Sequence, residues 1–351
     1  MTSTSEIEVI TELTGRRDRL HEARQNDATG PDVEVQGLIA DLDAALDRLE
    51  HGTFGICEVC HEDIGIARIT SDPLARCCVE HPTTDELARV QRDLRLARTV
   101  QLGLLPRATC RVTGWEYRYK YEPASEVGGD FCDVISIPSR PVARDARHDE
   151  DATLVLVGDV SGKGVAASML MSSLLATFRS LASIGLPPRE ILARANAVFH
   201  DLAPGPSYAT LGAAVLLPGG AVDLYSAGHW PPILRHEGLT IPLTVAAGLP
   251  LGLFPDSTYA PTRIRLGQGD TLLFFTDGVV EAENSRGDDY SLARLGDALA
   301  AAERDPLETV VDRCLRDVRA FQDRARVDDD VLLFAVRGER EMNANEASLP
   351  H

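Results

Sequence analysis

The sequence is short of positive charge. It carries 35 lysine and arginine residues against 54 aspartate and glutamate residues, so its formal net charge is −19 at neutral pH. A surplus of negative charge repels nucleic acids and anionic membranes at long range. We therefore expect neither a nucleic acid nor a membrane among the partners of this protein.

Long apolar runs and a basic leader are missing as well. No apolar run approaches the roughly 18 residues that span a bilayer, and the first residues, MTSTSEIEVITEL, are acidic where a signal peptide is basic. These absences predict a cytoplasmic protein. Hydrophobic residues make up 44% of the chain and charged residues 25%, close to the globular average. A length of 351 residues then predicts two folded domains.

The first hundred residues are predicted to be mainly helical. Leucines at 38, 42, 46 and 49 follow helical spacing, and the stretch 26–31 is rich in turn-forming residues, so residues 1–50 are expected to form a helical hairpin. A further helix is expected over 84–104. Its apolar stripe has the 3-4-3-4-3 spacing of a short coiled coil, which favours a homodimer through this helix: Leu87, Val90, Leu94, Ala97, Gln101 and Leu104. An ordinary amphipathic helix packed on its own domain explains the stripe equally well.

Beyond residue 107 the pattern changes to mixed strands and helices. Strands are predicted at Thr153–Val160, Ala209–Leu217, Thr271–Phe275 and Val331–Val336, and helices at Ala166–Ile184, Arg189–Leu202 and Pro306–Arg324. The order is not a repeated βαβ unit, so sheets covered by helices are favoured over a doubly wound fold. The fold class is therefore α+β. The stretch Ser139–Asp151 is expected to be a solvated loop.

Four of the seven cysteines lie between residues 57 and 78. Cys57 and Cys60 form one pair with two residues between them, and Cys78 and His81 form a second. Two such pairs joined by a loop supply the four ligands of a closed, structural zinc site. Two alternatives stay open, because Cys77 can replace Cys78 and His61 can compete with His81.

The surrounding residues resemble a known family. The stretch LEHGTFGIC at 49–57, the stretch CHEDIGIARI at 60–69 and Pro73 are similar to the zinc finger of DksA/TraR proteins, over about residues 35–82. His81 stands where a fourth cysteine is usual. DksA-like proteins act on RNA polymerase through acidic residues at the tip of a coiled coil, whereas Asp41 and Asp43 lie inside a helical run. Regulation of polymerase is therefore kept only as an alternative, in which the larger domain is a scaffold.

Four acidic motifs stand next to glycines or strand-like runs. Asp130 lies in VGGDF, Asp159 in GDVSGKG, Asp277 in FTDG, and the triplet 328–330 precedes an apolar strand. An aspartate at a strand end has a rigid base, and carboxylates suit hard cations such as Mg²⁺. Each motif alone is weak, because Asp-Gly is a common turn and an acidic triplet is usually solvated.

Together the motifs resemble the SpoIIE-like branch of the PPM phosphatases. The ordered series GGDF, GDVSGKG, SAGHWPP, GLPLGL, FFTDGVVEA and DDV covers about residues 85–337. The resemblance implies an αββα two-sheet sandwich, preceded here by the helical hairpin and zinc finger. It also implies two Mn²⁺ or Mg²⁺ ions: Asp130, Asp159 and the backbone carbonyl of Val160 at one, and Asp159, Asp277 and Asp329 at the other. Asp330 is the alternative to Asp329 if the register slips by one residue.

The resemblance further implies a metal-dependent protein serine/threonine phosphatase. Such an enzyme hydrolyses phosphoserine or phosphothreonine with water activated between two metals. The implied substrate is a phosphorylated regulatory protein, such as an anti-anti-sigma factor of the STAS type. Small-molecule phosphatase activity is a further alternative. His229 can either position substrate or serve the structure, and Cys132 is expected to pack in the core. The expected domains are 1–83, a connecting helix at 84–106, the phosphatase domain at 107–338 and a disordered tail at 339–351.

Overall fold

The computed structural model describes residues 4–26, 33–112, 114–138, 152–302, 305–323 and 329–338. The chain divides into two compact units, Met1–Asp93 and Leu94–His351. Most of the expected turn at 26–31, the expected loop at 139–151, the expected tail at 339–351 and Asp328 lie outside the described residues.

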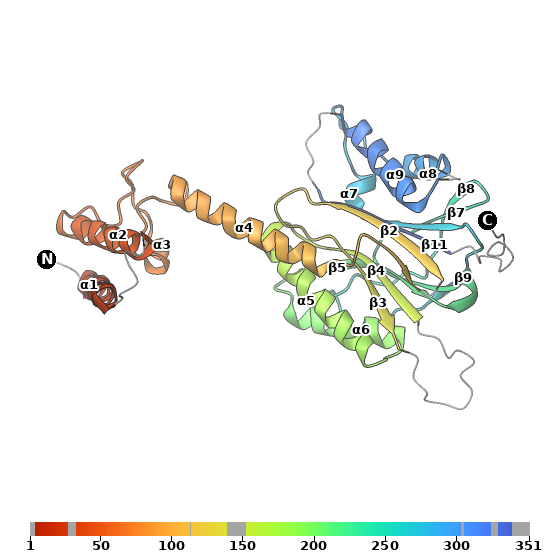
Figure 1. Ribbon diagram of the computed structural model, residues 1–351, viewed down its shortest axis with the longest axis horizontal. Coiled ribbons are helices and arrows are strands. Elements are labelled where there is room, and N and C mark those ends of the chain that lie inside the picture. The colour runs from red at the N-terminus through yellow and green to blue at the C-terminus, as the bar shows by residue number, and fades with distance from the viewer. Residues whose placement is uncertain are drawn as a thin grey trace, which may run out of the picture. The chain divides into compact units, whose positions relative to one another are not determined.

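The N-terminal unit contains a pair of helices and a small finger. Helices α1 (Thr4–Asn26) and α2 (Val33–Glu50) pack together as the predicted hairpin. The contact buries Leu13, Leu42 and Ala45. After α2 the chain forms a series of turns and the short helix α3 (Ile66–Ser71) (Figure 1). The four clustered cysteines lie in the turns before and after α3. The core of this unit is therefore small, and the finger has a separate cluster of buried side chains.

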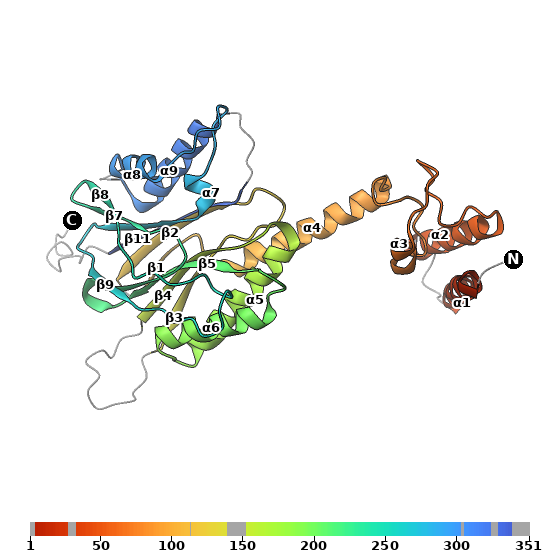
Figure 2. The same ribbon diagram turned by 180° about the vertical axis from the view of Figure 1, so that it is seen from behind.

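The second unit is a sandwich of two antiparallel sheets (Figures 1 and 2). One sheet has the strand order β1 (Thr109–Val112), β2 (Trp115–Glu122), β11 (Val331–Gly338), β10 (Thr271–Phe275), β7 (Ile233–His236) and β8 (Leu239–Pro242). The other has the order β3 (Phe131–Ile137), β4 (Ala152–Val160), β5 (Ala209–Leu216), β6 (Ala221–Ala227) and β9 (Thr262–Arg265). The predicted α+β fold is confirmed.

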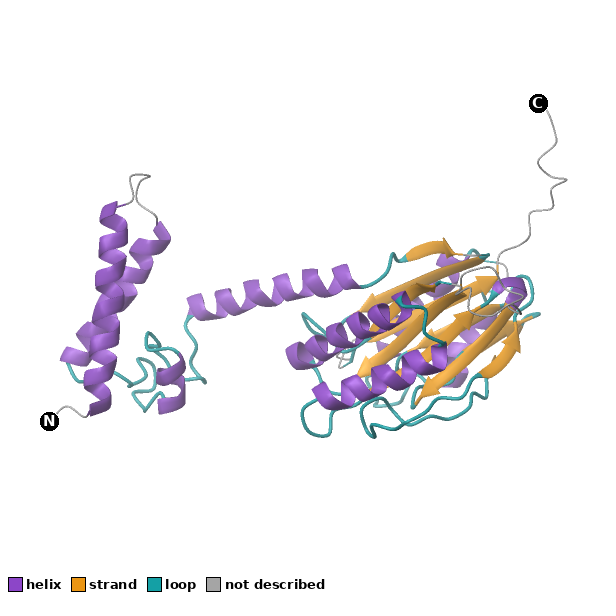
Figure 3. Cartoon of the chain, turned by 90° about the horizontal axis from the view of Figure 1, so that it is seen from below, coloured by secondary structure: helices purple, strands orange, loops and turns teal. Residues whose placement is uncertain are grey.

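Helices cover the outer face of each sheet (Figure 1), and Figure 3 shows two of them in front of the strands. Helices α5 (Gly164–Ser183) and α6 (Pro188–Leu202) pack against each other, and α5 packs on β3 and β4. On the opposite side, α9 (Leu307–Gln322) packs on β2 and β11, while α8 (Leu292–Ala300) packs on β7 and β8. The short helix α7 (Asp277–Val280) follows β10 directly. The layers are therefore α, β, β and α.

Helix α5 departs from one expectation. Among the described helices it is long and apolar enough to cross a membrane by length and composition, although the sequence was expected to contain no such segment. The packing gives another reason for its apolar character. Met171, Leu174, Leu175 and Phe178 are buried at helical spacing against the sandwich. The apolar face of α5 therefore belongs to the core of this unit.

Helix α4 (Thr84–Leu104) occupies the predicted range. The helix opens with reciprocal bonds in which the Glu86 backbone N–H donates to Thr83 Oγ1 and the Thr83 N–H donates to a Glu86 carboxylate oxygen. This capping box fixes where the helix begins. One residue of the predicted seam is buried within the second unit, because Gln101 is only 3% exposed, whereas Leu87 and Val90 are exposed.

Candidate metal centres

Three of the predicted aspartates converge at one edge of the sandwich. Asp130 immediately precedes β3, Asp159 lies at the end of β4, and Asp277 follows β10 of the opposite sheet. One carboxylate oxygen of each lies within 4.8 Å of the others. The two sheets thus bring together side chains that are up to 147 residues apart in the sequence.

The exposure of the four predicted aspartates increases from the interior of the protein to its surface. Asp130 is 1% exposed, Asp159 and Asp277 are half-buried, and Asp329 is exposed. Asp329 is not among the three converging carboxylates. Its Oδ2 atom instead lies 3.3 Å from Lys163 Nζ. The open side of the cluster is therefore the side of Asp329 and Lys163.

Asp330 forms different contacts from those of Asp329. Its Oδ1 accepts a hydrogen bond from the Ala124 backbone N–H at 2.8 Å, and its Oδ2 accepts one from Gly129 N–H at 2.8 Å. The side chain is 7% exposed. Both carboxylate oxygens are thus used to hold the loop that carries Asp130, which leaves Asp329 as the candidate ligand of the pair.

Two glycines allow this loop to come close to its neighbours. A Cβ at Gly129 would lie 2.6 Å from the Val160 carbonyl oxygen and 2.8 Å from Asp159 Oδ1. A Cβ at Gly128 would lie 1.8 Å from Asp330 Oδ2. Side chains at these positions would therefore displace the groups that surround the carboxylates. The close approach of this backbone to its neighbours explains the two glycines of the GGDF motif.

Thr276 is a site residue that sequence reasoning missed. Its hydroxyl donates a 2.7 Å hydrogen bond to Asp130 Oδ2 and accepts one from the Leu332 backbone N–H at 3.1 Å. The residue is fully buried. Thr276 therefore fixes the direction of the deepest carboxylate. No local pattern distinguishes it from an ordinary strand threonine.

Burial and mutual repulsion disfavour the charged forms of the clustered carboxylates. Burial and the nearby Asp159 carboxylate raise the pKa of Asp130 well above its usual value. Burial, followed by Asp277 and Asp329, raises the pKa of Asp159 to about 8. Carboxylates in such surroundings are stable in their charged form when a positive charge compensates them. An all-oxygen donor set of this kind fits Mg²⁺ or Mn²⁺.

The cysteine cluster forms a second candidate centre. Ligand atoms of Cys57, Cys60, Cys78 and His81 lie within 4.8 Å of one another. Cys60 Sγ is 3.9 Å from Cys78 Sγ, which in turn is 3.2 Å from His81 Nδ1. Hydrogen bonds from the backbone of Cys60 and Cys78 lower the pKa of the Cys57 thiol to about 6. Three sulfurs and one imidazole nitrogen fit tetrahedral zinc, since the thiolate is the ligand form.

The two open alternatives lie outside this group. Neither Cys77 nor His61 belongs to the four converging residues. Cys77 is 3% exposed, and burial raises the pKa of its thiol, whereas His61 is exposed and has a positive φ of 59°. The geometry therefore favours Cys78 and His81 as the second pair.

Comparison with known proteins identifies the second unit. Residues 149–339 match the family model of Stage II sporulation protein E (SpoIIE). The chain belongs to the SpoIIE family. The match includes Asp159, Asp277 and Asp329, while Asp130 precedes it. The SiaA-PP2C domain of Pseudomonas aeruginosa has a similar fold, with a TM-score of 0.60 and 18% identity over 73% of this chain and 99% of that domain.

Curated relatives of this SpoIIE-family chain include two bacterial proteins. Phosphoserine phosphatase RsbU of Bacillus subtilis is 27% identical over 59% of this chain, and Protein IcfG of Synechocystis sp. is 26% identical over 70%. The chain covers 59% of RsbU and 41% of IcfG, so it spans about half the length of these relatives.

The N-terminal segment has a different relative. The RNA polymerase-binding transcription factor DksA of Caulobacter vibrioides is 44% identical over 57 residues, which are 16% of this chain and 40% of DksA. A DksA-like segment therefore precedes the SpoIIE-family domain, as the sequence resemblance suggested.

Two further residues of the SpoIIE-family domain are buried. His229 is 9% exposed, its Nδ1 lies 2.9 Å from Thr210 Oγ1, and burial lowers its pKa to about 4. A neutral, enclosed imidazole favours a structural role. Cys132 is fully buried on β3, and burial raises the pKa of its thiol well above its usual value. That environment suits packing and disfavours a nucleophile.

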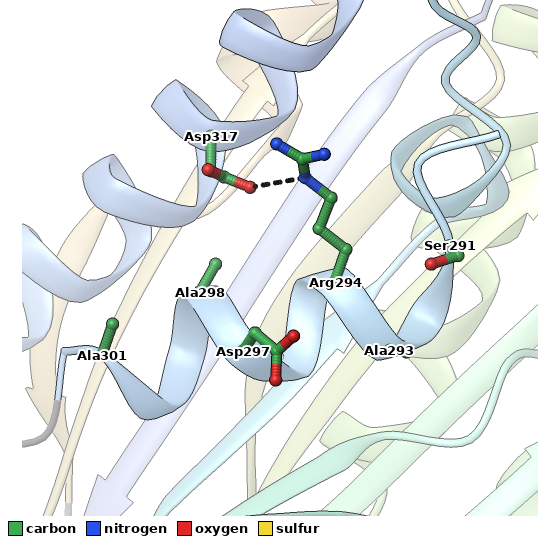
Figure 4. A pocket seen from close by; sticks show the side chains of 7 residues that line it. All are labelled: Ser291, Ala293, Arg294, Asp297, Ala298, Ala301 and Asp317. Atoms are coloured by element: carbon green, nitrogen blue, oxygen red, sulfur yellow. Dashed lines mark hydrogen bonds and ion pairs between the residues drawn. The ribbon is translucent and has the colours of Figure 1, made fainter. Parts of the chain in front are cut away.

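One pocket of the second unit is separate from the aspartates. A shallow pocket of about 600 Å³ lies between α8 and α9 (Figure 4). There Arg294 contacts the rings of Tyr290 and Phe321 and forms an ion pair with Asp317. A second pocket of about 410 Å³ is lined by Trp230, Glu281 and their neighbours. None of the four predicted aspartate ligands lines either pocket, so neither is the metal centre.

Proposed function

We propose that this SpoIIE-family chain is a metal-dependent protein serine/threonine phosphatase. The observation that carries the proposal is the convergence of Asp130, Asp159 and Asp277, from two sheets, within 4.8 Å. A scaffold without chemistry has no need to hold three carboxylates in a partly desolvated cluster, because their mutual repulsion costs stability. The cluster is therefore best explained as a cation site.

The proposed ligand sets are those that the resemblance to the PPM phosphatases implies. Asp130, Asp159 and the Val160 carbonyl would hold one Mn²⁺ or Mg²⁺ ion, and Asp159, Asp277 and Asp329 would hold the other, so Asp159 would serve both. Asp329 lies at the open side of the cluster, while Asp330 is engaged by the backbone of Ala124 and Gly129. The preference for Asp329 over Asp330 rests on this difference.

The chain supplies position and charge for the reaction. When bound, two divalent ions lower the pKa of a shared water and neutralise the phosphoryl oxygens. Thr276 orients the Asp130 carboxylate, and Asp330 fixes the loop that precedes it. The half-buried edge limits the water around the carboxylates, which strengthens their interaction with charge. No nucleophilic side chain is required, in agreement with the burial of Cys132.

We further propose that Cys57, Cys60, Cys78 and His81 hold one structural zinc ion. All four ligand positions come from protein atoms, which leaves none for water or substrate. The finger is small and has few buried side chains, so a bound metal would supply much of its stability.

The substrate proposed is phosphoserine or phosphothreonine on a regulatory protein, with a STAS-type anti-anti-sigma factor as the first candidate. RsbU, named a phosphoserine phosphatase, supports the chemistry of this proposal. Residues 1–83, 84–106 and 107–338 are proposed as the input module, connecting helix and phosphatase domain of a cytoplasmic protein. A homodimer through α4 would use Leu87 and Val90, which are both exposed.

A panel of substrates tests the proposal. Hydrolysis of phosphoproteins encoded by neighbouring genes is compared with that of nucleotides and para-nitrophenyl phosphate, with and without Mn²⁺. We expect Mn²⁺-dependent release of phosphate with preference for a phosphoprotein. A preference for a nucleotide would show that the substrate is a small molecule and not a protein. Absence of hydrolysis with every substrate would contradict the proposed phosphatase activity.

The DksA-like segment supports a second candidate function, binding to RNA polymerase. Its 44% identity to a polymerase-binding factor over 57 residues is the observation in favour. Co-sedimentation of the full chain with RNA polymerase tests this function separately, because it does not depend on the aspartates. A matched Asp159→Asn variant should bind polymerase as the wild type does if the two functions are independent.

A further inference from the structure

Lysine is almost absent from this protein. The sequence has 35 lysine and arginine residues, and only Lys120 and Lys163 are lysines. Lys120 lies on β2 and forms an ion pair with Asp312 at 3.1 Å. Lys163 lies in the GDVSGKG turn between β4 and α5, four residues after Asp159. One of the two lysines is therefore at the carboxylate cluster.

Lys163 stands on the side from which a substrate must come. Asp130 closes the inner end of the cluster with 1% exposure. At the outer end, the side chains of Lys163 and Asp329 are 66% and 52% exposed, and their charged atoms are 3.3 Å apart. A phosphoryl group on a protein surface can approach the aspartates from this outer end.

We propose that Lys163 binds the phosphoryl group of the substrate at the mouth of the centre, an inference that rests on the proposed phosphatase function. An ammonium group is a compact charge with three donors on a flexible stem, which suits phosphate oxygens. Asp329 competes for the ammonium in the structure described here. A metal ion held by Asp329 would balance its charge and would leave the Lys163 ammonium available to a phosphate dianion.

The overall charge of the protein gives this contact added weight. A chain of net charge −19 repels a dianion at long range. A cation fixed at the entrance offsets part of that repulsion. Its loss should weaken the binding of every phosphate ligand, whatever group carries the phosphate.

The scarcity of lysine allows a direct measurement. Reductive methylation of the full chain with ¹³C-formaldehyde keeps the charge of each lysine and labels Lys120, Lys163 and the terminal amine for NMR. The Lys163 signal is assigned by its loss in Lys163→Arg. Titration with inorganic phosphate in saturating Mg²⁺ should shift the Lys163 signal saturably and leave the Lys120 signal in place. This measurement needs no turnover, so a failure to bind phosphate can be told apart from a failure to hydrolyse it.

Kinetics supply the second measurement, with Lys120→Gln as the matched control. Lys163→Gln should raise the KM for phosphoprotein and the inhibition constant of inorganic phosphate by about tenfold, the effect of one charged hydrogen bond. Lys163→Arg should recover part of the loss. Calorimetric Mg²⁺ affinity should stay within about twofold of wild type, because Lys163 is not a ligand.

Two results would overturn the assignment. If the Lys163 signal does not respond to phosphate and the inhibition constant of phosphate is unchanged in Lys163→Gln, Lys163 does not bind the phosphoryl group. A change confined to Mg²⁺ affinity would show that Lys163 serves only as the counter-ion of Asp329.

Discussion

Gln101 holds both polar backbone groups of Gly128. Its Nε2 donates to the Gly128 carbonyl at 2.7 Å, and its Oε1 accepts from the Gly128 N–H at 3.2 Å. Gln101 lies in the last turn of α4, and Gly128 lies two residues before Asp130. The end of the helix is thus fastened to the loop that carries the deepest carboxylate of the cluster.

Replacing Gln101 should therefore disturb metal binding. Gln101→Ala leaves two buried backbone groups without partners, at a cost of about 1–3 kcal/mol in the free energy of unfolding. We expect weaker Mn²⁺ binding by calorimetry because the loop before Asp130 loses an anchor. Gln91→Ala, at an exposed position of the same helix, is the control. Wild-type affinity in Gln101→Ala would show that Asp330 alone holds the loop.

Asp159→Asn should abolish metal-dependent hydrolysis. The proposed bridging position needs a negative charge, and a neutral amide does not balance two cations. We expect a fall in kcat of at least about 1000-fold with a folded protein by circular dichroism. The exposed Asp256→Asn is the control. Normal turnover by a folded, Mn²⁺-saturated Asp159→Asn protein would refute the two-metal mechanism.

The two neighbouring aspartates should respond in different ways. Asp329→Asn should lower Mn²⁺ affinity while leaving thermal stability near that of wild type, since its side chain is half exposed. Asp330→Asn should lower the free energy of unfolding by about 1–3 kcal/mol, because one carboxylate oxygen that accepts backbone N–H groups is replaced by a donor. Calorimetry and urea unfolding of both variants measure the contrast. The reverse pattern would assign the ligand to Asp330.

Purified protein should contain one zinc ion per chain after dialysis. Cys57→Ser and Cys60→Ser should lose it, because serine does not replace a thiolate at zinc. Cys77→Ser should keep it, since Cys77 is outside the converging group. Elemental analysis measures zinc in each variant. An unchanged zinc content in the Cys57 and Cys60 variants would contradict the proposed zinc site. Loss of zinc in Cys77→Ser would show that Cys77, in place of Cys78, is the ligand.

His229 should make the fold sensitive to mild acid. Its pKa is about 4 in the folded protein and about 6.5 when exposed, so the unfolded chain takes up the proton first as the pH falls. Stability from this group is complete above about pH 6.5 and is lost as the pH falls toward 4. Between about pH 7 and pH 5 the loss is about 2 kcal/mol.

Comparison with a variant isolates the effect of His229. Urea unfolding of wild type and His229→Asn at both pH values should show a smaller pH dependence in the variant. The ring signals of His229 in NMR should not titrate above about pH 5. Titration near pH 6.5 would show that water reaches the imidazole in solution.

Local patterns were enough to predict much of the fold. The strands at 153–160, 209–217, 271–275 and 331–336 were found by their apolar, β-branched runs, and the structure contains β4, β5, β10 and β11 there. The sandwich and its family followed from an ordered series of motifs. Side-chain alternation, glycine turns and ligand spacing are properties of short segments, so the sequence displays them directly.

Tertiary structure decided which contacts each of those segments makes at the carboxylate cluster. Asp330 bonds to Gly129 across 201 residues, Thr276 bonds to Asp130 across 146, and Gln101 bonds to Gly128 across 27. None of these pairs has a local signal, because each forms only when two sheets and a helix end are packed together. The sequence by itself determined which side chains can bind metal. The packing decided which carboxylates face one another, which hold the backbone and which reach solvent, since burial and distance arise only in the folded chain.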